Sequence, residues 1–181
     1  MERLSDNFKE EIMDNISIDN LQNEVKVGFV LTVAERVFSV ISKDDERYPE
    51  GREALDKCWL WVESHAVTGD DLYELIDNAD FTGISEFAEE EEDLNIARLW
   101  SLLVDAVAYT SWEAYKKEKV KYLPQALESI NNDSITIFLN SAVETGFITL
   151  KEIEKIGKGI ENYQSTNTEI PTKREEFIKL F

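Results

Sequence analysis

Acidic side chains are the residues of this sequence whose number and spacing could support chemistry. Twelve carboxylates and no lysine or arginine lie between Cys58 and Ala97, in a chain with 38 acidic and 19 basic residues. Clustered carboxylates bind divalent cations, and an acidic surface also attracts basic proteins. The Asp-x-Asp-x-Asp-Gly pattern of calcium loops is absent. Three interpretations remain: a solvated face, a metal site, or a docking surface for a cationic partner.

The spacing within the acidic run leaves a solvated face and a docking surface open, and favours a metal site least. Residues 70–78 are predicted to form a helix, and the 3.6-residue period places four carboxylates on one of its faces. Like charges at this spacing cost about 0.2–0.5 kcal/mol per pair, and no lysine lies within the same helix to relieve them. Aromatic residues in the run are candidate anchors for a partner. The predicted partner-binding residues are Asp70, Asp71, Tyr73, Glu74, Asp77, Phe81, Glu89, Glu90, Glu91 and Asp93.

The single histidine and single cysteine predict no catalytic or metal centre. A helical di-iron site needs a glutamate three residues before each histidine, and Val62 occupies that position before His65. One histidine and one cysteine are too few for a zinc site. We therefore expect Cys58 to be a small core residue and His65 to be a core or half-buried one. No phosphate-binding loop or serine-nucleophile motif occurs, so we expect neither enzymatic activity nor a cofactor.

Asp105 interrupts an apolar run in the predicted helix 94–118. Breaking a buried ion pair leaves a charge that costs about 3–5 kcal/mol, so a buried Asp105 needs a cation. Arg36 on another apolar helix, or Arg98 on the same stripe, is expected to supply it. The alternative is a seam that reaches solvent, where Asp105 needs no partner.

The composition predicts a soluble, cytoplasmic protein with a packed core. Apolar residues make up 43% of the chain, but no apolar run approaches the roughly 20 residues of a membrane helix. A single cysteine excludes an internal disulfide. The net charge of -19 argues against direct binding of nucleic acid or of an anionic membrane. Whether the chain forms homo-oligomers stays open.

Helices must position all of these side chains. Only seven glycines and three prolines occur, and apolar residues recur at three-to-four spacing. The predicted helices are residues 5–15, 20–42, 50–66, 70–78, 83–91, 94–118, 124–130, 133–145, 150–162 and 172–180. We expect an all-α, single-domain bundle of about eight to ten helices around two central apolar helices, residues 25–41 and 96–108.

The domain is expected to span residues 1–163, followed by a linker at 164–171. The short C-terminal helix at 172–181 belongs to the same domain, but its position stays open.

Several segments together resemble a known family. They are residues 54–63 (ALDKCWLWVE) followed by 69–77 (GDDLYELID), residues 105–115 (DAVAYTSWEAY) leading into 122–126 (YLPQA), and residues 34–36 (AER) upstream. Over residues 25–146 this order resembles the all-helical immunity protein 6 family of bacterial polymorphic toxin systems. The resemblance implies a cytoplasmic antidote that binds a toxin and protects the producing cell. It supplies no catalytic residues.

The residues that match the family pattern look like determinants of the fold rather than contact residues. They are Trp59, Trp61, Asp105 and Trp112, to which Arg36 is added as the expected partner of Asp105.

The leading hypothesis is an immunity protein that neutralises a cognate basic toxin by stoichiometric binding through its acidic surface. A nuclease is the expected toxin, because proteins that act on nucleic acid present basic faces to phosphate. Two alternatives are a helical metal-dependent hydrolase that uses the clustered carboxylates, and an acidic adaptor whose charge serves solubility.

Overall fold

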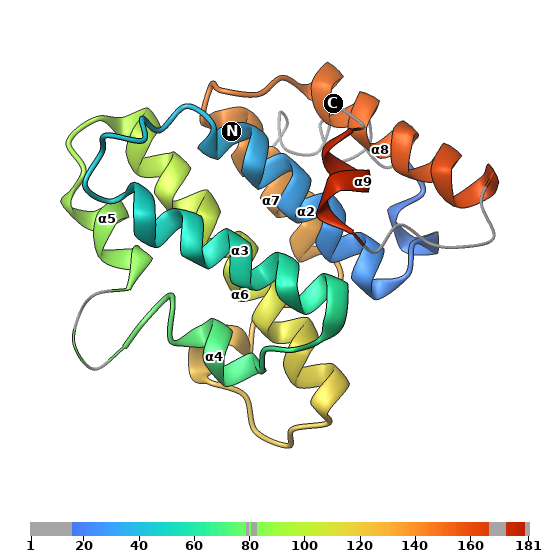
Figure 1. Ribbon diagram of the computed structural model, residues 1–181, viewed down its shortest axis with the longest axis horizontal. Coiled ribbons are helices and arrows are strands. Elements are labelled where there is room, and N and C mark those ends of the chain that lie inside the picture. Colours follow the sequence, from blue (N-terminus) through green and yellow to red (C-terminus); the bar gives the residue numbers. More distant parts are fainter. Residues whose placement is uncertain (1–15, 79, 81–82, 167–172, 180–181) are drawn as a thin grey trace.

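The computed structural model describes residues 16–78, 80, 83–166 and 173–179, which form helices and connecting turns without any strand. The all-α fold class is confirmed. The predicted helix at 5–15 lies outside the described residues. The α-helices are α2 (Asn23–Phe38), α3 (Tyr48–Ser64), α4 (Gly69–Tyr73), α5 (Ile84–Glu90), α6 (Leu94–Glu118), α7 (Ser134–Glu144), α8 (Leu150–Thr166) and α9 (Arg174–Ile178), and the 3-10 turns are η1 (Ile18–Asn20) and η2 (Gln125–Leu127) (Figure 1).

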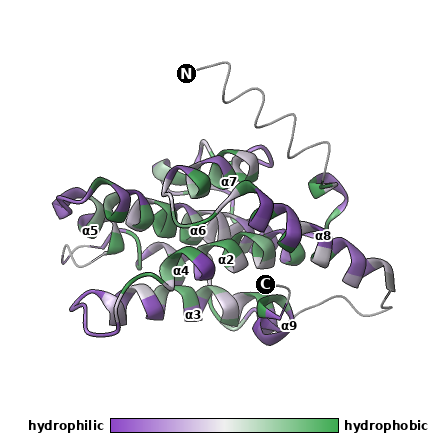
Figure 2. Ribbon diagram, turned by 90° about the horizontal axis from the view of Figure 1, so that it is seen from above, coloured by the Kyte–Doolittle hydropathy of each residue, from purple (hydrophilic) through white to green (hydrophobic). Residues whose placement is uncertain are grey.

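Helices α2 and α6 are the two central helices that the apolar pattern predicts. Twelve of the sixteen residues of α2 are buried. Helix α6 packs against five other α-helices: α2, α3, α4, α5 and α7. Figure 2 shows α2 as a largely hydrophobic helix in the middle of the molecule, with many hydrophilic residues on outer elements such as α8.

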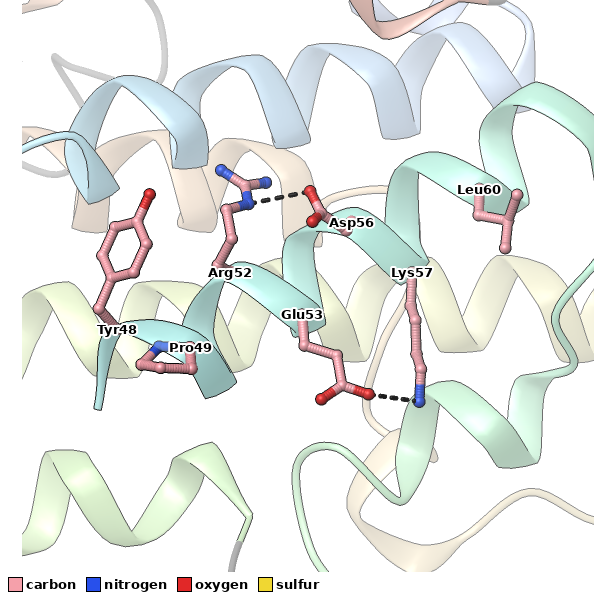
Figure 3. A pocket seen from close by; sticks show the side chains of 7 residues that line it. All are labelled: Tyr48, Pro49, Arg52, Glu53, Asp56, Lys57 and Leu60. Atoms are coloured by element: carbon pink, nitrogen blue, oxygen red, sulfur yellow. Dashed lines mark hydrogen bonds and ion pairs between the residues drawn. The ribbon is translucent and has the colours of Figure 1, made fainter. Parts of the chain in front are cut away.

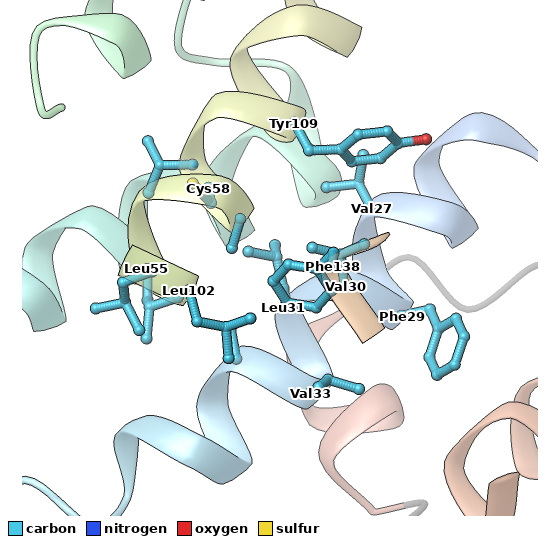
Figure 4. Packing of buried hydrophobic residues seen from close by; sticks show 14 of the residues in the cluster. Val27, Phe29, Val30, Leu31, Val33, Leu55, Cys58, Leu102, Tyr109 and Phe138 are labelled. Carbon is cyan, nitrogen blue, oxygen red and sulfur yellow. The ribbon is translucent and has the colours of Figure 1, made fainter. Parts of the chain in front are cut away.

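The core forms where side chains of α2 meet those of its neighbours. Val30 and Leu31 of α2 lie near Leu102 of α6 and Phe138 of α7, with Cys58 of α3 beside them (Figure 4). All five side chains are almost completely inaccessible to solvent. Removing this much apolar surface from water is the dominant favourable contribution to folding.

Helix α4 is shorter than the predicted helix 70–78. Its start has a capping box, in which the Thr68 hydroxyl accepts from the Asp71 amide and the Asp71 carboxylate accepts from the Thr68 amide. The helix then ends because the carbonyls of Leu75 and Ile76 accept from the amides of Ile84 and Ser85. Asp77 therefore lies beyond the helix, and the predicted face of four carboxylates on one helix is only partly formed.

The C-terminal helix α9 lies against α2 and α3. Phe177 is fully buried, with its ring centroid 5.4 Å from that of Trp59. A Cβ atom at Gly28 of α2 would overlap the Phe177 ring, so a glycine is required at this close approach. Arg174 also bonds carboxylates of α2 and α3, which places its charge away from the acidic run.

The predicted linker at 164–171 begins too early. Helix α8 continues to Thr166, and residues 167–172 lie outside the described part of the chain. Among the helices that the structure describes, none is both long and hydrophobic enough to traverse a bilayer.

Candidate partner-binding surface

The acidic run lies on two helices that flank α3. Helix α4 packs near the C-terminal end of α3, whereas the end of α5 approaches the start of α3 through an ion pair between Arg47 and Glu91 (Figure 1). Both α4 and α5 also pack against α6. The fold therefore divides the predicted partner-binding residues into a group around α4 and a group at the end of α5.

Four of these carboxylates are engaged within the fold. Asp70 accepts a hydrogen bond from the hydroxyl of Tyr115, and Asp71 caps α4. Glu91 accepts from Arg47 at 2.8 Å, and Asp93 caps α6 by accepting from two backbone amides.

The bonds made by Asp71 and Glu91 also change their acidity. The backbone amide and the hydroxyl of Thr68 lower the pKa of Asp71, and the amide of Asp93 followed by Arg47 lowers that of Glu91. The lowered pKa values mean that the fold stabilises the charged form of both groups. They are poorer contact candidates than sequence alone predicts, because a partner would compete with these bonds.

The other acidic residues of the run are more available. Glu74, Asp77, Glu89 and Glu90 are exposed, and none has a side-chain hydrogen bond or ion pair with a described residue. The same holds for Asp80 and Glu92, which the prediction did not include. These six carboxylates keep their charge free for a partner.

Three aromatic residues of the run, all predicted as candidate anchors, have different outcomes. Tyr73 is half-buried on α4, whereas Phe81 lies outside the described residues. Phe87 stacks edge-on against Trp100 with ring centroids 4.9 Å apart, so it packs against the core and is a poorer anchor than predicted.

A hollow of about 470 Å³ lies beside α4, among the acidic residues around that helix. Three carboxylates contribute to its wall, together with Lys57 of α3, which is bonded to Glu53 at 3.0 Å. Lys57 is thus a cation near this face that belongs to another helix. The lining residues are Lys57, Val67, Asp71, Glu74, Leu75, Asn78 and Asp80.

A second hollow, of about 460 Å³, follows the outer face of α3 (Figure 3). Its charged side chains are paired with one another: Arg52 bonds Asp56 at 2.9 Å, and Lys57 bonds Glu53 at 3.0 Å. Because these charges compensate each other, this hollow offers less attraction for a charged partner than the hollow beside α4.

The prediction that Asp105 forms an ion pair with Arg36 or Arg98 is wrong. Arg36 bonds Glu152 of α8 at 3.0 Å, and Arg98 donates to the backbone carbonyl of Glu144 at 3.2 Å. Asp105 has no hydrogen bond or ion pair with a described residue and is open to solvent, as in the alternative of an accessible seam. It also lines a cavity of about 310 Å³, whose walls desolvate the carboxylate and raise the pKa of Asp105 to about 6.

The carboxylate that links α2 to α3 and α9 is that of Glu35, and the sequence analysis did not predict this role. Its carboxylate accepts from Arg52 at 2.7 Å, from Arg174 at 2.8 Å and from the indole nitrogen of Trp59 at 3.0 Å. Its position between Ala34 and Arg36 in an apolar helix was the available signal, but only the packing shows which cations reach it.

The three tryptophans assigned to the fold differ in burial. Trp59 and Trp61 are buried in the core. Trp112 is half-buried, beside Tyr109 and beneath the ammonium group of Lys116, which lies 3.9 Å from its ring centroid.

Cys58 is a core residue, as predicted, and the His65 side chain, 35% exposed, lies at the edge of the core rather than within it. His65 ends α3 in the left-handed conformation, with φ of 53°, and this turn carries the residue to the surface. Its imidazole lies 3.2 Å from Glu24. Across the part of the chain that the structure describes, no group of three or more His, Cys, Asp or Glu side chains is placed to hold a metal ion.

A family model matches the sequence of most of these helices. The model of the family described as immunity protein Imm6 matches residues 25–145, which cover α2 to α7 with the acidic run. Neither the curated proteins nor the solved structures include a significant match. Immunity proteins bind a cognate toxin. Because the matched region spans more than half of the sequence, the chain belongs to the Imm6 family of immunity proteins.

Proposed function

We propose that this immunity protein neutralises a basic protein toxin by one-to-one binding through the exposed carboxylates that follow α4 and those at the end of α5. The observation that carries the proposal is the set of exposed carboxylates without partners among the described residues: Glu74, Asp77, Asp80, Glu89, Glu90 and Glu92. Their mutual repulsion is relieved when a cationic surface approaches.

A nuclease is the toxin that this surface suits best. Enzymes that cleave nucleic acid bind phosphates through lysine and arginine, so their substrate-binding faces are basic. An acidic protein that covers such a face excludes the substrate. Complementary charge also accelerates association, up to about 10⁸–10⁹ M⁻¹s⁻¹ at low salt.

Charge reversal of residues that the fold does not use tests this proposal. The paired substitutions Glu74→Lys with Asp77→Lys, and Glu89→Lys with Glu90→Lys, should each raise the Kd for the toxin encoded beside this chain by about tenfold or more at low salt. Asp70 and Asp71 are less suitable targets, because changing them disturbs Tyr115 and the α4 cap.

The matched control reverses two exposed acidic residues outside the run, Asp19→Lys with Glu175→Lys, which changes the net charge by the same amount. This control should shift the Kd much less, because distant charges are screened within about 10 Å at 0.1 M salt. Equal Kd values for all three double variants would place the interface elsewhere. A binding-competent complex that leaves nucleic-acid cleavage unimpaired would contradict substrate exclusion.

A further inference from the structure

A second surface of the molecule carries a charge that the fold leaves without a partner. Asp105 of α6 opens into the cavity of about 310 Å³ that is lined by α6, by α7 and by residues 129 and 130 of the turn before α7. Its carboxylate forms no hydrogen bond or ion pair with any residue in the described ranges. A partly desolvated carboxylate is stabilised in its charged form by a nearby cation.

The two cations that the sequence suggests as partners of Asp105 are bonded elsewhere. Arg36 is bonded to Glu152 at 3.0 Å. Arg98 lies two turns before Asp105, which is about 10 Å along the helix axis, and donates instead to the carbonyl of Glu144. The cation must therefore come from outside the described part of this chain.

The cavity walls suit the stem and head of one arginine side chain. Its volume is at the small end of the roughly 300–1,000 Å³ range of ligand sites. Tyr109 and Phe138 form the buried apolar wall of the cavity, against which the stem of an arginine can pack, and Ile137, 66% exposed, extends this wall outward. Serine hydroxyls contribute polar groups to the lining. The complete lining is Asp105, Ala108, Tyr109, Ser129, Ile130, Ser134, Ile137 and Phe138.

We propose that an arginine side chain of the toxin inserts into this cavity and pairs with Asp105, so that the α6–α7 face forms a second contact region. The inference rests on the proposed function and extends it from diffuse charge attraction to one anchored residue. Arginine is enriched in interfaces, and its planar fork can bond a carboxylate through two nitrogens. Because the cavity is present before binding, the anchor needs little rearrangement.

A small probe tests the cavity without the toxin. In a methyl NMR titration, n-butylguanidinium should produce saturable shifts at Ala108 and Ile137 in the wild-type protein. The shifts should be lost in Asp105→Asn and should be absent with uncharged n-butylurea. The absence of saturable shifts, or equal shifts in Asp105→Asn, would overturn the inference.

Binding of the toxin encoded beside this chain then separates the inference from the proposed function. Asp105→Asn should raise the Kd about tenfold, whereas the exposed control Asp19→Asn should leave it unchanged within about twofold. If Asp105→Asn binds like the control while the Glu74 and Asp77 reversals weaken binding, the inference is overturned and the proposed function stands. If the wild-type protein does not bind the toxin, both are overturned.

Discussion

Glu35 and Arg36 are neighbours in the sequence but serve different parts of the molecule. The Glu35 carboxylate, 9% exposed, joins α2 to α3 and α9 through Arg52, Arg174 and Trp59. Arg36 points toward α8 and bonds Glu152. Adjacent residues on a helix are rotated by about 100°, so a one-residue step changes the neighbouring element. The apolar pattern alone cannot show which of the two is the central charge.

Substituting Glu35 should destabilise the protein strongly. Glu35→Gln keeps the shape but leaves Arg52 and Arg174 partly buried with a weakened partner, and we expect a loss of about 3 kcal/mol in the free energy of unfolding. Urea unfolding measures this loss. Glu53→Gln removes an exposed ion pair on α3 and should change stability by less than about 0.5 kcal/mol. Equal effects of the two substitutions would contradict the central role of Glu35.

Asp105 should make the folded protein less stable as pH rises, the opposite of the effect of a carboxylate whose pKa is lowered by folding. Its pKa rises from 3.8 to about 6 on folding, so between these values the folded protein binds more protons than the unfolded chain. Stability from this group therefore falls as pH rises through this window, and the penalty is complete above pH 6.

Asp105→Asn removes the penalty and should stabilise the protein at pH 7.5, by less than about 1 kcal/mol because solvent screens the accessible carboxylate. The gain should shrink at pH 5. Urea unfolding at both pH values, with Asp44→Asn as an exposed control, checks this. A loss of stability at pH 7.5 would indicate a favourable partner for Asp105.

At the scale of elements, the helix ends were easier to predict than the helix contacts. Helix α6 has the bounds that were predicted, because Asp93 caps its start and Lys119 ends it in the left-handed conformation. Helix α4 stops early because the chain folds back, and the carbonyls of Leu75 and Ile76 just after the helix bond the amides of residues 84 and 85. Such a return depends on partners about nine residues away, which local periodicity does not record.

At the contact between α2 and α9, the effect of Gly28→Ala on stability should change sign when the Phe177 ring is removed. Gly28→Ala gains up to about 1 kcal/mol of helix propensity, but the methyl group would overlap the Phe177 ring, and overpacking costs about 1–3 kcal/mol. We expect a net loss of stability in the wild-type background. In the Phe177→Ala background the ring is absent, and Gly28→Ala should become stabilising.

A double-mutant cycle of these substitutions, followed by thermal unfolding, measures the coupling between α2 and α9. If the effect of Gly28→Ala is the same in both backgrounds, α9 does not occupy this position in solution.

Across the whole molecule, composition and periodicity predicted the all-α class and the two central helices, because burial on several sides leaves long apolar segments. The run of acids was equally visible, but its division between capping residues and free carboxylates was not. Asp93 and Glu90 are alike in the sequence, yet one caps α6 and the other is exposed without a described partner. Which carboxylate is bonded and which is exposed depends on how the helices pack, and the sequence pattern does not show this.

Salt should act in opposite directions on folding and on toxin binding. The net charge of -19 opposes the compact state, and raising NaCl from 10 mM to 0.5 M screens this repulsion. A gain of about 1 kcal/mol would raise Tm by about 2–4 °C. Over the same range the Kd for a basic toxin should increase. Calorimetry and titration at both salt concentrations check the pair, and a Tm that falls with salt would contradict it.

Cys58, the single cysteine, lies in the middle of the core, and burial raises the pKa of its thiol to about 12. Alkylating reagents attack the thiolate, so they reach this group only during openings that expose the interior. A bound toxin reduces the population of the opened protein by the factor 1 + [toxin]/Kd. The rate of alkylation of Cys58 therefore reports the affinity for the toxin. The measurement needs no engineered cysteine and can be made in a cell extract.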